Sequence, residues 1–177
     1  MISVLIISSE QGVDSRAALC HDGDNTTERA ISMYLQVKHF HELTTDELYA
    51  ILKLRVDVFV VEQSCPYGEL DGLDQKALHI WLRDEEGIEA YVRVLDKGVK
   101  SEHAAIGRVI AVKRRMGLGT RIVQAGLNAA RAYYGADSVY IEAQTYARGL
   151  YEKLGFRQIS GEFTEDGIPH IRMLIEF

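Results

Sequence analysis

The stretch KRRMGLGT, residues 113–120, decides the fold class of this chain. It follows an apolar run at residues 105–112 that is typical of a buried strand, and it leads into about sixteen residues with the apolar spacing of a helix. Glycines and basic side chains at a helix N-terminus favour anion binding, because free backbone N–H groups and the helix dipole meet there. A basic turn that merely starts a helix explains the stretch equally well.

Two familiar glycine loops do not fit this stretch. A dinucleotide-binding fingerprint needs a third glycine where Ile122 stands, and a P-loop needs Gly-Lys followed by Ser or Thr. The basic side chains still provide local positive charge in an acidic protein; they are Lys113, Arg114, Arg115 and Arg121.

Helical and strand patterns alternate on both sides of the stretch. Thr44 and Glu47 have capping-box spacing, and a helical face then continues to Phe59. An irregular segment, residues 62–76, follows it. A helix is also expected at residues 147–154, and strands are expected at residues 33–38, 78–83, 88–95, 105–112, 138–143, 156–162 and 168–175. This order predicts a mixed α/β (α+β) fold.

Composition sets the class of protein. The 177 residues suit one domain, with 47% hydrophobic and 26% charged residues. A net charge of -6 disfavours nucleic acid as a partner, and no apolar run reaches the roughly 18 residues of a membrane span. Two cysteines and the lack of a recognisable leader predict a reducing, cytoplasmic location without a membrane partner.

The first 32 residues differ from the rest of the chain. After a short apolar run they become rich in Ser, Asp, Asn and Thr without a sustained period. We expect residues 1–32 to be a dispensable extension and residues 33–177 to form the domain. The alternative is that residues 3–7 add an edge strand.

A second motif, YEKLGF at residues 151–156, lies about thirty residues after the glycine loop, on an expected helix that ends in glycine. Arg114-x-x-Gly117-x-Gly119 followed by this motif resembles the Gcn5-related N-acetyltransferase (GNAT) superfamily over residues 33–177. Three further stretches resemble its ElaA-like branch: LRVDVFVVEQSCPY (54–67), IGRV (106–109) and EDGIPHIRM (165–173). The connection from IGRV to the glycine loop is about two residues shorter than is usual in that branch. This difference leaves open which residues among 109–112 present their backbone groups to the cofactor.

The resemblance implies a GNAT fold, with a mixed, mostly antiparallel central sheet flanked by helices, and acetyl-CoA as co-substrate without a metal. Pantetheine would lie beside the 105–112 strand as an additional strand. A backbone N–H there would stabilise the oxyanion, and Tyr151 would protonate the departing thiolate. The implied cofactor-binding residues are Ile110, Ala111, Val112, Arg114, Arg115, Met116, Gly117, Leu118, Gly119 and Thr120.

The general base is left open between an ordered water and three residues. Glu62 follows the first helix, Glu142 lies on the strand before the late helix, and His170 is a base, a substrate contact or a buried strand histidine. Asp71, Asp74 and His79 match no metal-site spacing, so we expect them to give a negative entrance for a cationic amine. Cys65 is expected to be a buried small side chain.

These residues predict an N-acetyltransferase that passes an acetyl group from acetyl-CoA directly to a primary amine, on a small molecule or a protein. The alternative is a non-catalytic acyl-CoA-binding sensor, which needs the glycine loop but no proton donor. The resemblance is also compatible with a homodimer.

Overall fold

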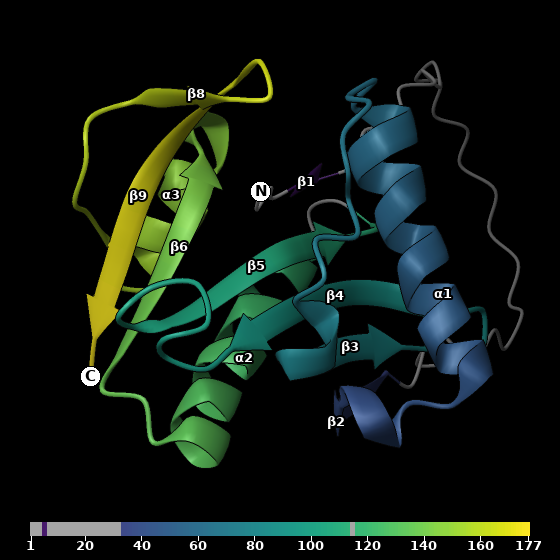
Figure 1. Cartoon of the computed structure of the whole chain (residues 1–177). Coiled ribbons are helices and arrows are strands. Elements are labelled where there is room, and N and C mark those ends of the chain that lie inside the picture. The colour runs from purple at the N-terminus through teal and green to yellow at the C-terminus, as the bar shows by residue number, and fades with distance from the viewer. Residues whose placement is uncertain (1–4, 7–32, 114–115) are drawn as a thin grey trace, which may run out of the picture.

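A computed structural model describes residues 5–6, 33–113 and 116–177. Nine strands form one sheet with helices on both faces (Figure 1). The strands are β1 (Leu5–Ile6), β2 (Tyr34–His39), β3 (Ala77–Arg83), β4 (Ile88–Leu95), β5 (Ala104–Ala111), β6 (Ser138–Gln144), β7 (Arg157–Gln158), β8 (Phe163–Glu165) and β9 (Ile168–Glu176). The α-helices are α1 (Thr45–Val56), α2 (Leu118–Tyr134) and α3 (Arg148–Lys153); shorter helical turns are η1 (Phe40–Glu42), η2 (Asp57–Glu62), η3 (Asp74–Lys76) and η4 (Thr145–Ala147).

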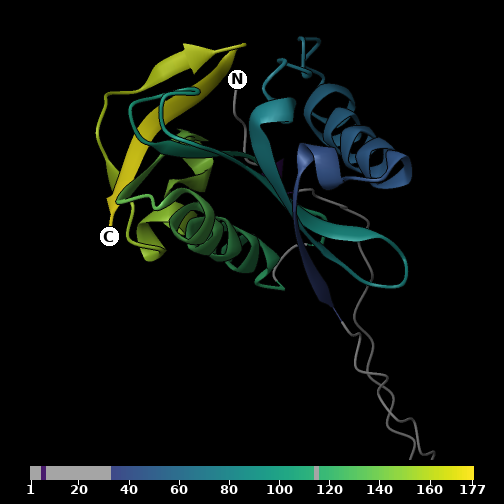
Figure 2. The same ribbon diagram turned by 60° about the horizontal axis from the view of Figure 1, so that its bottom comes forward.

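The sheet order is β2-β3-β4-β5-β6-β9-β7, with β1 paired to β5 and β8 paired to β9. Only the β1–β5 and β5–β6 pairs are parallel among these described strands. Helix α1 covers one face of the sheet, while α2 and α3 cover the other (Figure 2). The predicted mixed, mostly antiparallel sheet flanked by helices is therefore confirmed.

Strands β5 and β6 separate soon after they meet. They pair only at Ala104–Val139 and Ala105–Tyr140, whereas β4 accompanies β5 to Ala111. The β6-facing edge of β5 is thus free of β6 beyond Ala105. This opening lies at the centre of the sheet, where strands from both halves of the chain border it.

Helix α1 begins as its sequence predicts. Thr44 Oγ1 accepts the Glu47 N–H at 3.2 Å, and the Glu47 carboxylate accepts the Thr44 N–H at 2.9 Å, which completes the capping box. The expected single helical face is wrong in its last part, because residues 57–62 form a π-helical turn. The wider turn keeps Phe59 buried, while Val56 is exposed.

The closing hairpin differs from the prediction. A single strand over residues 156–162 does not form; β7 covers two residues and β8 three, and both pair with the same edge of β9. Between them the Ile159 N–H donates to the Arg172 carbonyl at 2.8 Å, so the backbone follows β9 across the interruption.

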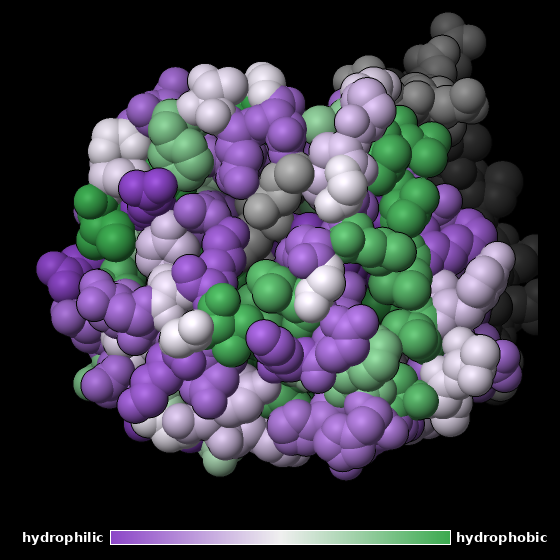
Figure 3. Space-filling model, in the orientation of Figure 1, coloured by the Kyte–Doolittle hydropathy of each residue, from purple (hydrophilic) through white to green (hydrophobic). Residues whose placement is uncertain are grey.

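Some apolar side chains remain on the surface. Figure 3 shows hydrophobic surface over α1 on the right of the molecule; Val56 of α1 and Val61 of η2 are exposed. No helix in the described ranges is long and apolar enough to cross a membrane. The homodimer stays a prediction.

A buried ion network fixes the irregular segment between η2 and β3 onto the sheet. It consists of three arginines and three carboxylates: Arg55, Arg93, Arg108, Glu69, Asp71 and Asp74. Arg55 donates two hydrogen bonds of 2.9 Å to the Glu69 carboxylate in a bidentate pair, and a third of 2.6 Å to Asp74. Arg93 donates to Asp71 at 2.6 Å and to Asp74 at 2.9 Å.

We expect Asp74→Ala to lower the free energy of unfolding by about 3 kcal/mol or more, because it leaves Arg55 and Arg93 without a shared buried partner. For a chain of this size the melting temperature should fall by about 6–12 °C. Urea and thermal unfolding measure both quantities. The control Asp57→Ala removes the partner of Lys53 in an exposed pair, and it should change stability by less than about 0.5 kcal/mol. Equal effects of the two variants would refute a stabilising network.

The same network predicts the direction of acid unfolding. Burial alone would raise the pKa of Asp71 and of Asp74. Hydrogen bonds and charge from Arg93 lower the pKa of Asp71, and those from Arg55 and Arg93 lower the pKa of Asp74, so that both lie below the ordinary range. The unfolded chain therefore binds more protons than the folded chain as pH falls. Stability should be complete above about pH 5 and decrease progressively below about pH 4. Urea titrations between pH 7 and pH 3 test this; a free energy of unfolding that rises on acidification would contradict it.

Candidate active site

A β-bulge in β5 forms one side of the opening. Tyr91 pairs with Ile110 and Arg93 pairs with Gly107, so one residue of β4 opposes two residues of β5. Arg108 lies in this bulge with φ +54°, a left-handed conformation that costs free energy for a residue other than glycine. Strain of this kind is often found at functional sites.

Arg108 and its neighbour Tyr67 each have a buried polar atom without a described hydrogen-bond partner on the β5 side of the opening. It is fully buried, its Nε and Nη2 bind Glu69, and its Nη1 has no hydrogen-bond partner in the described structure. The rings of Phe59 and Tyr67 lie about 6 Å from the guanidinium, at 5.9 and 6.0 Å. The Tyr67 hydroxyl is also buried without a described partner, and burial raises its pKa to about 12. Buried polar atoms without partners commonly mark a place for water or a ligand.

Gln144 and His170 form the other side of the opening. They are a cross-strand pair of β6 and β9, and both are buried. The Nε2 atoms of both side chains lack a hydrogen-bond partner among the described residues. Gln144 Nε2 can donate a hydrogen bond, and His170 Nε2 can accept one when it carries no proton; an amine or hydroxyl group makes both kinds of hydrogen bond.

Contacts of the His170 ring assign its tautomer. Nδ1 lies 2.8 Å from the Ile168 carbonyl oxygen, which can only accept, so Nδ1 carries the proton in the neutral ring. Nε2 is then a lone-pair acceptor. The ring also stacks on Phe163, with centroids 5.9 Å apart. A fixed imidazole whose buried Nε2 keeps an unpaired lone pair has the chemistry of a general base.

The two sides meet at Cys65 and the β8–β9 turn. Cys65 Sγ lies 3.6 Å from the Asp166 carbonyl oxygen, a weak thiol hydrogen bond between segments far apart in sequence. Cys65 is half-buried, so the expectation of a buried side chain is wrong. Burial and the nearby Asp166 charge raise the pKa of the thiol, which disfavours a nucleophilic thiolate.

Tyr151 lies on α3, within the core of the α2 face. It is fully buried, its ring meets Phe156 edge-to-face at 5.6 Å, and its hydroxyl has no described hydrogen-bond partner. Burial raises its pKa well above the ordinary value, so the hydroxyl stays protonated at neutral pH. Such a group can donate a proton but is a poor base.

The glycine loop reaches α2 through a left-handed residue. Gly117 has φ +70° and is the N-cap of α2, a conformation that other residues adopt only with strain. A Cβ at Gly119 would lie 3.5 Å from Leu150, an ordinary contact, so packing does not require glycine there. Absence of a side chain at Gly119 instead favours close approach of a ligand to the first-turn N–H groups.

The remaining residues predicted for this loop are placed differently. Leu118 is buried in the core, whereas Met116 and Thr120 are exposed. Arg114 and Arg115 lie outside the described residues. The predictions for these two arginines therefore stay predictions.

The resemblance implies that backbone groups at the end of β5 bind the cofactor, at Ile110, Ala111 and Val112. Ile110 and Ala111 pair with Leu5 and Ile6 of β1 along the edge that β6 leaves, and the Val112 N–H donates to the Glu89 carbonyl at 2.9 Å. A strand does form within residues 3–7, at Leu5–Ile6. It is not the edge strand of the alternative prediction, because it pairs with β5 at the centre of the sheet.

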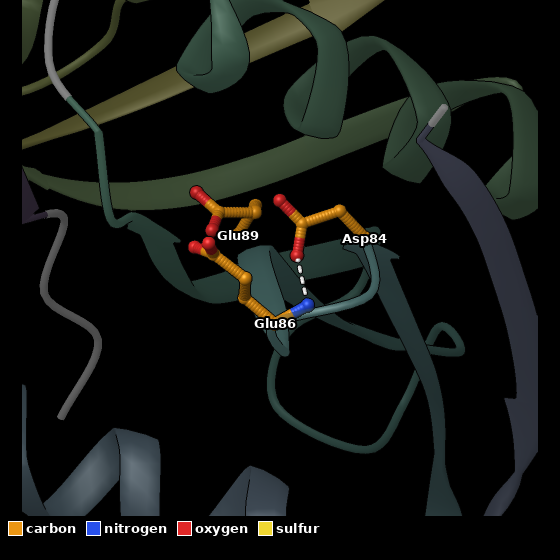
Figure 4. Close-up of side chains that lie close together, drawn as sticks. All are labelled: Asp84, Glu86 and Glu89. Carbon is orange, nitrogen blue, oxygen red and sulfur yellow. Dashed lines mark hydrogen bonds between the residues drawn. The ribbon is translucent and has the colours of Figure 1, made fainter. Parts of the chain in front are cut away.

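Lys113 does not supply free charge to the loop, contrary to the expectation from the sequence. Figure 4 shows Asp84, Glu86 and Glu89 with their carboxylates close together. The Lys113 ammonium lies 2.9 Å from Glu89, 3.7 Å from Asp84 and 3.8 Å from Glu86. Lysine is therefore the cation of this acidic cluster, and it ties the end of β5 to the β3–β4 turn.

The two carboxylate candidates for the base differ from His170. Glu62 is exposed at the end of η2. Glu142 accepts from Lys100 at 2.5 Å and from the Tyr140 hydroxyl at 2.8 Å. Burial would raise its pKa, but Lys100 lowers it, and a low pKa makes the carboxylate a weak base.

The expected negative entrance is wrong for the residues named for it. Asp71 and Asp74 are engaged by arginines, while His79 is buried between the Tyr91 hydroxyl at 2.8 Å and the Asp74 carbonyl at 3.0 Å. Sequence reasoning also missed Arg108, Tyr67 and Gln144 as site residues. Arg108 and Tyr67 lie inside the stretches that resemble the ElaA-like branch, and this position could have indicated them as site residues. No feature of the sequence indicated Gln144.

Comparisons with known proteins agree with this architecture. A family model described as an acetyltransferase (GNAT) domain matches residues 41–177. A UPF0039 protein of Schizosaccharomyces pombe is 36% identical over 143 residues, which cover 78% of this chain and 94% of that protein.

Two similar solved structures cover almost the same region. The crystal structure of Escherichia coli ElaA has a TM-score of 0.77 and 35% identity, covering 82% of this chain and 100% of that one. An acyl-CoA N-acyltransferase from Pseudomonas aeruginosa has a TM-score of 0.75 and 38% identity, covering 81% and 99%. With the separating strands and the glycine-capped helix described above, these matches show that the chain belongs to the GNAT acetyltransferase family, in its ElaA-like branch.

Proposed function

We propose that this protein transfers an acetyl group from acetyl-CoA to a primary amine by direct attack. The observation that carries the proposal is His170, whose tautomer leaves Nε2 as a buried, unpaired acceptor next to Gln144 at the end of β6. The similar Pseudomonas aeruginosa protein is described as an acyl-CoA N-acyltransferase, which supports the reaction class.

Each group then has a defined part in the transfer. The amine nitrogen attacks the thioester carbonyl carbon and gives its proton to His170 Nε2, while Gln144 Nε2 orients the acceptor. The carbon–sulfur bond breaks, and the Tyr151 hydroxyl protonates the leaving thiolate. The unprotonated imidazole nitrogen of His170 accepts one proton and the phenol of Tyr151 donates another, so the transfer needs no covalent enzyme intermediate.

The glycine-capped helix fits the phosphates of the co-substrate. The left-handed Gly117, the absence of a side chain at Gly119 and the first-turn N–H groups of α2 together suit the binding of an anion. Arg114 and Arg115 add positive charge beside it in the sequence. We therefore assign the pyrophosphate to this loop.

Calorimetry with acetyl-CoA, followed by a thiol-release assay on a panel of primary amines, tests the proposal. We expect micromolar binding that Arg114→Ala/Arg115→Ala weakens by about tenfold or more, and thiol release that depends on an amine. Binding without amine-dependent thiol release would favour the acyl-CoA sensor. Absence of binding would refute the loop assignment.

A further inference from the structure

The N-terminal strand β1 lies on the part of β5 that the proposed function reserves for the co-substrate. Leu5 pairs with Ile110 and Ile6 pairs with Ala111 in parallel, beside the opening from which β6 has departed (Figure 1). The opposite edge of β5 is paired with β4 at the same residues. The edge toward the opening therefore has one row of N–H and C=O groups, which one strand can use at a time.

Local sequence explains why a strand forms at this place. Residues 4–7 are Val-Leu-Ile-Ile, which favour extended backbone, and an unpaired edge within a sheet readily accepts another strand. The pantetheine arm carries amide groups and would use the same hydrogen bonds in the same way. The paired segment is only two residues long, so its hold on β5 is weak and reversible.

We infer that β1 and the pantetheine arm of acyl-CoA compete for the β5 edge at Ile110–Ala111, so that the chain carries its own reversible inhibitor. This inference rests on the proposed function. Acyl-CoA binds only when β1 has left, and the apparent dissociation constant is the intrinsic constant divided by the fraction of molecules with a free edge. High acyl-CoA concentrations displace β1, and any partner that captures residues 1–32 would activate the protein.

The first test uses the full chain with Leu5→Pro/Ile6→Pro. Proline removes the N–H donors of β1 and should prevent pairing, whereas the matched variant Leu5→Val/Ile6→Val keeps the donors and the strand propensity. In calorimetric titrations, acetyl-CoA should bind the proline variant about threefold to thirtyfold more tightly than the natural chain, and the valine variant should bind like the natural chain. Equal melting temperatures would show that all three are folded.

A second measurement does not depend on acetyl-CoA. Amide hydrogen exchange at residues 106–112, without ligand, should be faster in the proline variant than in the valine variant, because β1 no longer covers the edge. Equal acetyl-CoA affinities in all three chains would overturn the competition and leave the proposed function intact. Weaker binding by the proline variant would also overturn it. If none of the chains binds acetyl-CoA, the proposed function fails and the competition fails with it.

Discussion

Replacing Tyr151 by phenylalanine should lower kcat for amine acetylation by about 10²- to 10³-fold and leave the acetyl-CoA dissociation constant within about twofold. The hydroxyl is the proton donor in the proposed transfer, and its raised pKa keeps it protonated at neutral pH. A group that acts only in the transition state lowers kcat and kcat/KM together when it is removed. Steady-state thiol release and calorimetry on the same preparations measure the two quantities.

The variant should be as stable as the natural protein or slightly more stable, because the buried hydroxyl has no described partner to lose. Tyr146→Phe is a matched control: Tyr146 is 58% exposed and close enough to influence the Tyr151 hydroxyl, and its loss should change kcat by less than about twofold. Full activity of the Tyr151 variant would make Tyr151 a packing residue, held by its edge-to-face contact with Phe156.

Regular elements with a strong period were predictable from the sequence. The capping box of α1, the β3–β4 hairpin and the glycine start of α2 depend on residues close together in the chain, and all three form where their patterns place them. Local hydrogen bonds and hydrophobic spacing decide these features. The same holds for Tyr151 within the predicted late helix.

Features that depend on distant residues were not predictable. The sequence places Asp71 and Asp74 at a negatively charged entrance, and only the tertiary fold brings Arg93 and Arg108 to the carboxylates of residues 69–74. The same applies to β1, whose pairing with β5 requires the separation of β6. For the base, the sequence leaves three candidate residues; the contact between His170 Nδ1 and Ile168, which the sequence does not reveal, is the reason that we propose His170.

His170→Gln should lower kcat by about 10²- to 10³-fold at neutral pH, with the acetyl-CoA dissociation constant within about threefold. Glutamine keeps a polar side chain of similar size but has no basic nitrogen. His41→Gln is the control, because His41 is exposed on η1, and its kcat should stay within about twofold of the natural value.

The pH profile separates a base from a structural histidine. Without a base, the reaction depends on amine that has already lost its proton in solution, and an alkyl amine has a pKa of about 10.4. The rate of the glutamine variant should therefore increase about tenfold per pH unit between pH 7 and pH 9, whereas the natural protein should respond much less steeply. A uniform loss of activity at every pH, together with a lower melting temperature, would instead assign His170 to the packing of Phe163 and the β8–β9 hairpin. The slope, more than the size of the loss, decides between the two roles.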